Sequence, residues 1–315
     1  MTEDYGFALN EVNIRNISSI SLKQAELCER RIIEFYEISS ELARGLGQYR
    51  DEMSVFEMLT LLSEALCMPE CSAHTDALRI NRNRLESFMS SISAFDKVIL
   101  SDILIESLQN AGIRVMEEDF LVQNDSPETF TYVKNALADE AYSVFCDSFS
   151  DPRLKYSSTL KETAALAAEG SVTYALLPLE ESGGERLHTA TELIFKYDLK
   201  INSVTPVFGL DGSADMKYAL VSRKFTVPRI NADDDAYLEI RLSSDASLSE
   251  IICAAEHFGA RVYRANTVTL DNDGTAESYC LLVFKSETGS FIGLLAYLTL
   301  FVNSYTPVGI YKNLE

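Results

Sequence analysis

The sequence predicts a multidomain protein of mixed α/β and α+β class, with a helical N-terminal segment, a central α/β segment and a C-terminal ferredoxin-like sandwich. Three observations lead to this fold class. Apolar residues recur at steps of three and four in the first third of the chain. Short apolar runs then alternate with helical patterns, and from residue 235 onward the elements follow the order βαββαβ.

The charge of the chain limits its partners. The 315 residues include 48 Asp and Glu against 27 Lys and Arg, a net charge of −21. Such a field repels phosphate backbones and anionic lipid, so nucleic acid and membrane are not expected partners. The acidic start resembles no signal peptide, and the longest uncharged apolar run, 291–302, is too short to span a bilayer. Six scattered cysteines, mostly on apolar faces, favour a reduced, cytoplasmic protein.

Residues 1–122 are predicted to be helical. From Leu22 onward, one face of a long helix carries a stripe that we expect to be core, with one hydroxyl in it: Ala25, Cys28, Ile32, Phe35, Ser39, Leu42 and Leu46. Ser54, with Glu57 three residues later, forms a capping box that begins a second helix. After a loop at 67–76, further helices are expected at 79–93 and 96–110, and Gly112 ends the last of them.

The polar segment 123–129 is the predicted linker to a second domain, residues 129–226. Strands are expected at 129–135, 154–158, 172–179, 199–207 and 217–225. Helices are expected at 138–149, 159–170 and from about residue 185. This alternation predicts an α/β layer with a partly parallel sheet.

A second linker, 227–235, leads to the third predicted domain, residues 235–315. Its strands are expected at 237–243, 261–270, 278–286 and 306–312, and its helices at 248–258 and 290–303. The letters DNDG at 271–274 are typical of a hairpin turn between the middle strands.

The letters EESGG after the strand at 172–179 have two interpretations. One is an ordinary strand-to-helix loop. The other is a ligand-binding loop in which a glycine pair opens a helix and offers backbone N–H groups to an anion, with the candidate residues Glu180, Glu181, Ser182, Gly183 and Gly184. CMPEC with His74 resembles half a zinc site, but no second pair follows at suitable spacing, so no metal or cofactor is predicted. We interpret His188 as a half-exposed helix residue rather than a general base.

The amino-acid sequence of this region is similar to that of a known family. YALLPLEESGGERLHTATELIFKYDL resembles the prephenate dehydratase signature, with matches at Pro178, Glu180, Ser182, Lys196, Tyr197, Asp198 and Leu199. SSELARGLGQYR, from Ser39, resembles the first helix of the chorismate mutase domain that is often fused ahead of the dehydratase. The resemblance implies a periplasmic-binding-protein-like lobe that holds prephenate, followed by an ACT domain that binds phenylalanine.

The chain departs from this family at its functional positions. The catalytic letters T-R-F become Met216, Lys217 and Tyr218, and only FGLDGSAD stands where the family inserts a second lobe. Ser39 and Leu22 fall where the mutase has arginines. In the ACT-like domain, the candidate ligand or interface positions are Ala246, Ser247, Leu248, Asn266 and Thr267.

These departures predict a catalytically silent protein that is regulatory or binds a small molecule, such as an aromatic amino acid or its precursor. The alternative is an active prephenate dehydratase that forms phenylpyruvate in L-phenylalanine biosynthesis. No catalytic residue is assigned. We also expect a homodimer, because one C-terminal helix is more apolar than its domain is expected to bury, at Phe291, Leu294, Leu295, Leu298 and Phe301.

Overall fold

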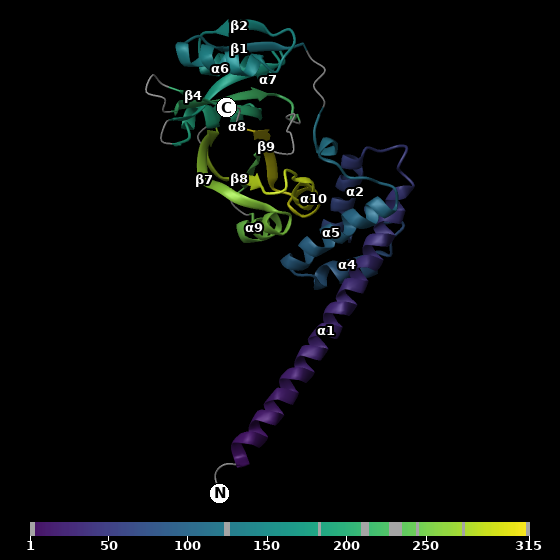
Figure 1. Ribbon diagram of the computed structural model, residues 1–315. Helices are drawn as coiled ribbons and strands as arrows, with labels where there is room; N and C mark the ends of the chain where they lie inside the picture. The colour runs from purple at the N-terminus through teal and green to yellow at the C-terminus, as the bar shows by residue number, and fades with distance from the viewer. Residues whose placement is uncertain are drawn as a thin grey trace. The chain divides into compact units, whose positions relative to one another are not determined.

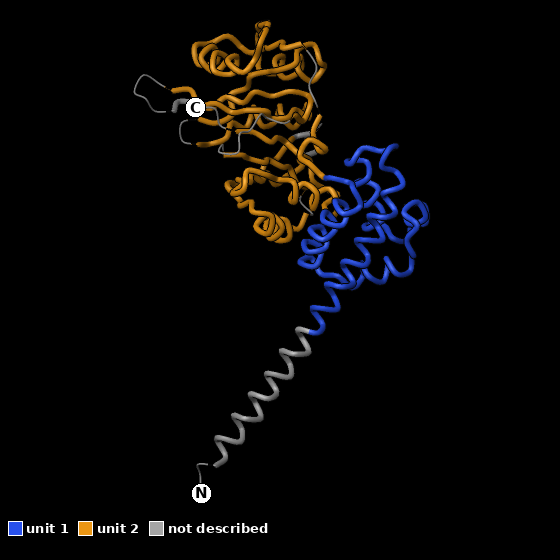
Figure 2. Tube along the Cα trace, turned by 45° about the vertical axis from the view of Figure 1, so that its right-hand side comes forward, with its two compact units in different colours: residues 1–114 blue, residues 115–315 orange. Residues whose placement is uncertain are grey.

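The computed structural model describes residues 4–122, 127–181, 184–208, 214–226, 235–243, 246–272 and 275–312. Side chains are described from residue 26 onward, except those of 214–215, 271–272 and 275. The chain forms two compact units, residues 1–114 and 115–315, which Figure 2 shows in different colours.

The first unit is helical, as predicted. Its helices are α1 (Asp4–Gly47), α2 (Val55–Cys67), α3 (Ser72–Ala77), α4 (Arg82–Ser91) and α5 (Ala94–Asn110) (Figure 1). The predicted capping box begins α2, since the Ser54 side chain accepts from Glu57 N and the Glu57 side chain accepts from Ser54 N. Gly112 ends α5 with a φ of +82°. The short helix α3 lies in the segment that was predicted to be a loop.

Among the described side chains of the stripe on α1, those in its C-terminal half are buried; the side chain of Ala25 lies outside the described residues. Phe35, Ser39, Leu42 and Leu46 are core, whereas Cys28 is exposed and Ile32 is 45% exposed. Helix α5 begins opposite Arg31, whose guanidinium lies 3.0 Å from the Asp96 carboxylate. The part of α1 that precedes this point therefore extends beyond the start of α5. The prediction that Ile32 is core was wrong, because periodicity identifies an apolar face but not what covers it.

The second unit is a mixed α/β structure. Its first part contains η1 (Glu117–Phe120), β1 (Thr129–Val133), α6 (Ala136–Cys146), β2 (Arg153–Ser157), α7 (Leu160–Ala168), β3 (Tyr174–Glu181), α8 (His188–Lys196), β4 (Lys200–Phe208) and β5 (Ala214–Ser222). The rest contains β6 (Ala236–Ser243), α9 (Leu248–His257), β7 (Ala260–Asn272), β8 (Thr275–Ser286), α10 (Ile292–Phe301) and β9 (Tyr305–Lys312). The predicted order of elements is confirmed in both parts.

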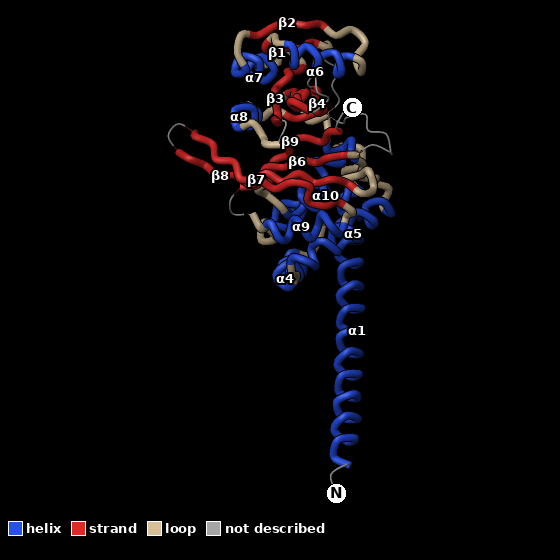
Figure 3. Tube along the Cα trace, turned by 60° about the vertical axis from the view of Figure 1, so that its left-hand side comes forward, coloured by secondary structure: helices blue, strands red, loops and turns tan. Residues whose placement is uncertain are grey.

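All nine strands named above belong to one sheet, in the order β2-β1-β3-β5-β4-β9-β6-β8-β7 (Figure 3). The neighbours of β1 are parallel to it, as predicted, and β4 and β5 are antiparallel. β4 and β9 are parallel and join two groups of strands, which we call the N-terminal half (β1–β5) and the C-terminal half (β6–β9). Residues 129–226 and 235–315 thus share one sheet.

The junction between the two halves is narrow. Its register consists of one pair, Ile201 and Gly309, and a Cβ on Gly309 would lie 2.4 Å from the Ile201 carbonyl oxygen. Lys200 Nζ adds a second contact by donating to the Pro307 carbonyl oxygen at 2.9 Å. Close backbone approach here depends on glycine.

Two hydrophobic clusters lie on opposite faces of the N-terminal half. Helix α6 covers one cluster, which includes Phe130 and Leu176. Helices α7 and α8 cover the other, which continues onto the C-terminal half through Tyr237 and Tyr311. One core therefore spans the junction between the halves.

Most apolar side chains of helix α10 are buried. Phe291, Leu294, Leu295 and Leu298 are each at most 1% exposed, and Phe301 is intermediate. These four side chains therefore leave almost no apolar surface open to a second copy of the chain.

The six cysteines are free thiols, and the expectation of mostly apolar faces fails at Cys28, Cys67 and Cys253, which are exposed. Within the described ranges, no helix has the length and apolar character needed to cross a membrane.

Candidate functional site

The segment after β3 is a tight antiparallel turn. Glu181 N donates to the Glu185 carbonyl oxygen and Leu187 N to the Leu179 carbonyl oxygen, each at 2.9 Å. Gly184 has a φ of +75° and donates its N–H to the Glu181 carbonyl oxygen at 2.8 Å. Helix α8 begins only at His188 rather than near residue 185. Gly184 therefore closes a turn and does not open a helix; Ser182 and Gly183 lie outside the described residues.

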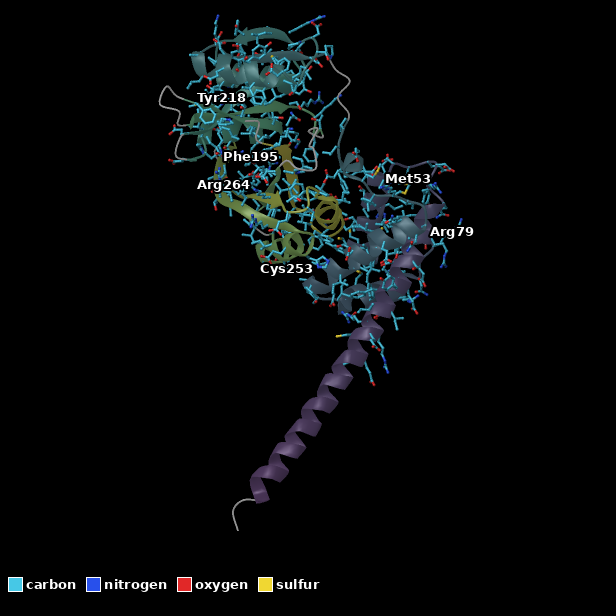
Figure 4. The ribbon with its side chains drawn as sticks, viewed as in Figure 1. Met53, Arg79, Phe195, Tyr218, Cys253 and Arg264 are labelled. Atoms are coloured by element: carbon cyan, nitrogen blue, oxygen red, sulfur yellow. The ribbon has the colours of Figure 1, made fainter. Side chains whose placement is uncertain are left out.

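Glu180 faces the interior, whereas Glu181 is exposed. The pairing of β3 with β5 shifts register between Pro178 and Glu180, so a bulge changes the direction of the carboxylate. Glu180 is 6% exposed and accepts a hydrogen bond at Oε1 from Arg264 Nη1 of β7. A charge so deeply buried requires a partner, and Figure 4 labels Arg264 on its strand.

Lys217 provides a second cation for the same carboxylate. Its Nζ lies 3.2 Å from Glu180 Oε2. That oxygen accepts no well-directed hydrogen bond from the described residues, so the contact with Lys217 is mainly electrostatic. Burial alone would raise the pKa of Glu180, but the Arg264 hydrogen bond and the Lys217 charge outweigh it and lower the pKa.

The structure separates the three positions predicted from T-R-F. Met216 and Tyr218 join the cluster under α6 on one face of β5, while Lys217 reaches Glu180. The hydroxyl of Tyr218, labelled in Figure 4, donates to Asn135 Oδ1 at 3.4 Å, and burial raises its pKa. Only Lys217 of the three therefore contacts the predicted loop.

A second buried ion pair joins the same turn to β6. Arg186 donates to both oxygens of Glu239, at 2.9 and 2.6 Å, and the two side chains are 6% and 0% exposed. Tyr311 also donates to Glu239, at 3.0 Å. Burial would lower the pKa of Arg186, but the Glu239 carboxylate raises it. Burial and the same carboxylate raise the pKa of Tyr311 well above its usual value.

A small cavity lies between the two halves of the sheet. Glu180 and Lys217 line it from the N-terminal half, and Tyr237, Tyr263 and Tyr311 from the C-terminal half. Its volume of about 10 Å³ is room for roughly one water molecule. The Tyr237 ring centroid lies 5.2 Å from that of Tyr263 and 5.8 Å from that of Tyr311.

The two groups of ion pairs at this junction carry a net positive charge. Three cations, Arg186, Lys217 and Arg264, face two carboxylates, Glu180 and Glu239. The cluster thus has one excess positive charge in a chain whose formal charge is −21. Such a local reversal of sign favours an anionic ligand.

The predicted ACT-like positions lie elsewhere. Ala246 and Ser247 precede α9, and Leu248, its first residue, is 40% exposed. Asn266 and Thr267 lie on β7, opposite Leu281 and Cys280 of β8. None of the five lines the cavity at the junction.

Arg186, Glu239 and Arg264 were not among the site residues predicted from the sequence. A charged residue inside the apolar strand letters AYLEIRL was a signal at Glu239, because a charge that faces a core needs a partner. Arg264 lies 84 positions from Glu180, and only the fold brings them together.

No group of His, Cys, Asp and Glu among the described residues could hold a metal ion. His74 instead lies 3.1 Å from Glu64, and His188 is exposed on α8.

No family model matches this chain, and no curated protein does. The chain is similar in structure to a prephenate dehydratase from Streptococcus mutans, at 13% identity and a TM-score of 0.48, over 60% of this chain and 100% of that one. It is similar to GqqA, described as a novel type of quorum quenching acylase, at 15% identity and a TM-score of 0.43, over 59% and 96%. A prephenate dehydratase from Arthrobacter aurescens in complex with L-Phe shows 12% identity and a TM-score of 0.42, over 58% and 89%. All three are distant similarities.

Proposed function

We propose that this chain is a catalytically silent relative of the fused chorismate mutase and prephenate dehydratase proteins that its sequence resembles, and that it binds a small aromatic carboxylate as a regulatory or sensory protein. The contact between Lys217 and Glu180 carries the proposal. Lys217 stands where the resemblance places an arginine, and its charge is already shared with a carboxylate of the chain itself.

The chemistry of dehydration supports the absence of dehydratase activity in this proposal. Loss of water from prephenate requires a proton donor at the leaving hydroxyl, and the resemblance places a threonine for this role at position 216. The thioether of Met216 donates no hydrogen bond. Tyr218, the nearest phenol on that strand, is buried and donates to Asn135.

The helical unit supports the same conclusion for the mutase reaction. Chorismate is a dianion, and its rearrangement is accelerated by cations around it. Ser39, at the position of a mutase arginine, is 0% exposed, and its Oγ has no hydrogen-bond partner among the described residues. An uncharged hydroxyl inside an apolar core offers a dianion no binding energy.

We further propose that the chain forms a homodimer and that Ala246, Ser247, Leu248, Asn266 and Thr267 contribute to a ligand site or an interface. Support for the dimer comes from α1, which exposes three large apolar side chains within about 100° of one another around the helix: Ile32 (45%), Ile33 (57%) and Tyr36 (42%). A second copy of the same helix would cover such a face.

Turnover assays test the proposal. We expect purified protein incubated with prephenate to form no phenylpyruvate above background, and chorismate to remain unconverted. The double variant Met216→Thr/Lys217→Arg should not restore dehydration, because β4 and β5 pair directly and leave only residues 209–213 where the family inserts a lobe. Clear phenylpyruvate formation by the unmodified protein would establish the alternative, an active dehydratase.

A further inference from the structure

The donors of Lys217 and Arg264 exceed what Glu180 uses. Among the described residues, Arg264 donates to Glu180 through Nη1, and Lys217 approaches the other carboxylate oxygen without a well-directed hydrogen bond. A guanidinium has five N–H donors and an ammonium three. The side chains of both are partly open to solvent, at 21% and 28% exposed. Within the part of the chain that the structure describes, both cations therefore keep donors beyond those that Glu180 uses.

The charge balance points to one more anion. Arg186 and Glu239 neutralise each other in a bidentate pair, which leaves Lys217 and Arg264 to share Glu180. A single additional carboxylate would bring these two cations and two carboxylates to zero net charge. A phosphate or a dicarboxylate would leave excess negative charge in a partly buried site, which is unfavourable.

Aromatic rings surround the same place. Tyr263 is 52% exposed at the cavity, and its ring lies 5.9 Å from the Arg264 guanidinium and 5.2 Å from Tyr237. The cavity itself holds about one water molecule, so an aromatic ring would pack against Tyr263 at the opening while its carboxylate reaches inward. Edge-to-face packing of rings stabilises such an arrangement.

We infer that Lys217 of the N-terminal half and Arg264 of the C-terminal half form a composite site for the carboxylate of a small aromatic monocarboxylic acid, with Tyr263 as the platform for its ring. This inference rests on the proposed binding function and names its site. It lies at the junction of the two halves rather than at residues 246–248 and 266–267. A ligand bound there would contact both halves at once.

The test uses 3-phenylpropionate as probe and its neutral amide as control, with binding measured by saturation-transfer NMR and by titration calorimetry on the full chain. We expect the acid to bind and the amide to bind at least roughly tenfold more weakly, because only the acid supplies the missing charge. Arg264→Met and Lys217→Met should each weaken binding of the acid roughly tenfold or more. Arg261→Met is the matched control, since Arg261 lies on the same strand in an exposed pair with Glu287, and it should leave binding unchanged.

The variant Glu180→Gln should change the affinity for the acid in the opposite direction. Removing the carboxylate that the two cations share raises the local positive charge, so the acid should bind roughly tenfold tighter. This gain keeps the inference testable if Arg264→Met fails to fold by circular dichroism. Equal binding of acid and amide, no binding of the acid at 5 mM (about the weakest level of interest), or unchanged affinity in Glu180→Gln would each overturn the site. Dehydratase turnover would overturn catalytic silence and leave the site standing, so the two failures are distinct.

Discussion

Breaking the buried pair of Arg186 and Glu239 should be among the most destabilising single substitutions in the second unit. Arg186 comes from the turn after β3 and Glu239 from β6, so the pair holds the two halves of the sheet together. With side chains 6% and 0% exposed, removing either partner leaves the other as an uncompensated buried charge. Such a loss costs about 3–5 kcal/mol.

A double-mutant cycle separates the interaction energy between Arg186 and Glu239 from the cost of each single substitution. Arg186→Met and Glu239→Leu should each lower the free energy of unfolding by about 3–5 kcal/mol. The double variant replaces both charges with apolar groups, so it should lose only about 1–3 kcal/mol, mainly because Tyr311 keeps a buried hydroxyl whose acceptor is gone. The single losses should therefore sum to far more than the double loss, with a coupling energy of at least about 3 kcal/mol.

Urea unfolding followed by far-ultraviolet circular dichroism and tyrosine fluorescence measures these losses, since the chain contains 15 tyrosines and no tryptophan. With an m-value near 2 kcal/mol/M, a loss of about 4 kcal/mol lowers the midpoint by about 2 M. Asp151→Asn is the control, because its pair with Arg153 is 80% and 73% exposed and should contribute less than about 1 kcal/mol. Single variants that lose less than about 1 kcal/mol, or a double loss equal to the sum, would refute the reasoning.

Three further predictions concern the junction, the carboxylate of Glu180 and helix α1. Gly309→Ala should destabilise the second unit by about 1–3 kcal/mol in urea unfolding, because the new Cβ would lie 2.4 Å from the Ile201 carbonyl oxygen; an unchanged midpoint would contradict the close approach. The pKa of Glu180 is held below its ordinary 4.5, so its contribution to stability is complete above about pH 5 and is lost as the pH falls through the lowered pKa. Thermal melts between pH 5 and 3 should show a steeper fall for the unmodified protein than for Glu180→Gln, and parallel curves would be evidence against the pairing. Ile33→Asp, at a position 57% exposed on α1, should leave the circular dichroism spectrum unchanged and reduce self-association in sedimentation at moderate salt; a variant as associated as the unmodified protein would show that this face is not the interface.

Local structure could be predicted from the sequence where the relevant residues are close together in the chain. The Ser54–Glu57 capping box and the glycine at the end of α5 are interactions within a few residues, and both are present. The alternation of strands and helices also follows from local periodicity. The exposure of Ile32 could not be predicted, because it depends on which faces of α1 other helices cover and not on α1 itself.

The composition of the candidate site depended on contacts that no local pattern specifies. Arg186 and Glu239 are 53 positions apart, and Glu180 and Arg264 are 84 apart. Sequence letters identified Glu180 and Lys217 as candidates, each for a separate reason. Their contact follows from the antiparallel register of β3 and β5, which places Glu180 opposite Lys217. Register is a property of the assembled sheet, so neither residue alone predicts the pair.

Pro178 offers a local reason why Glu180 turns inward. Strict alternation along β3 would place Glu180 on the face of Leu176, beneath α6, and Leu179 on the other face. Both Leu179 and Glu180 instead line the cavity, because the register shifts between Pro178 and Glu180. Proline has no N–H to donate, and within sheets it is confined to edges, strand starts and bulges. A proline two residues before a glutamate in an interior strand therefore indicates a break in the alternation at that point, while the cations that the carboxylate meets there, Lys217 and Arg264, follow from the assembled sheet.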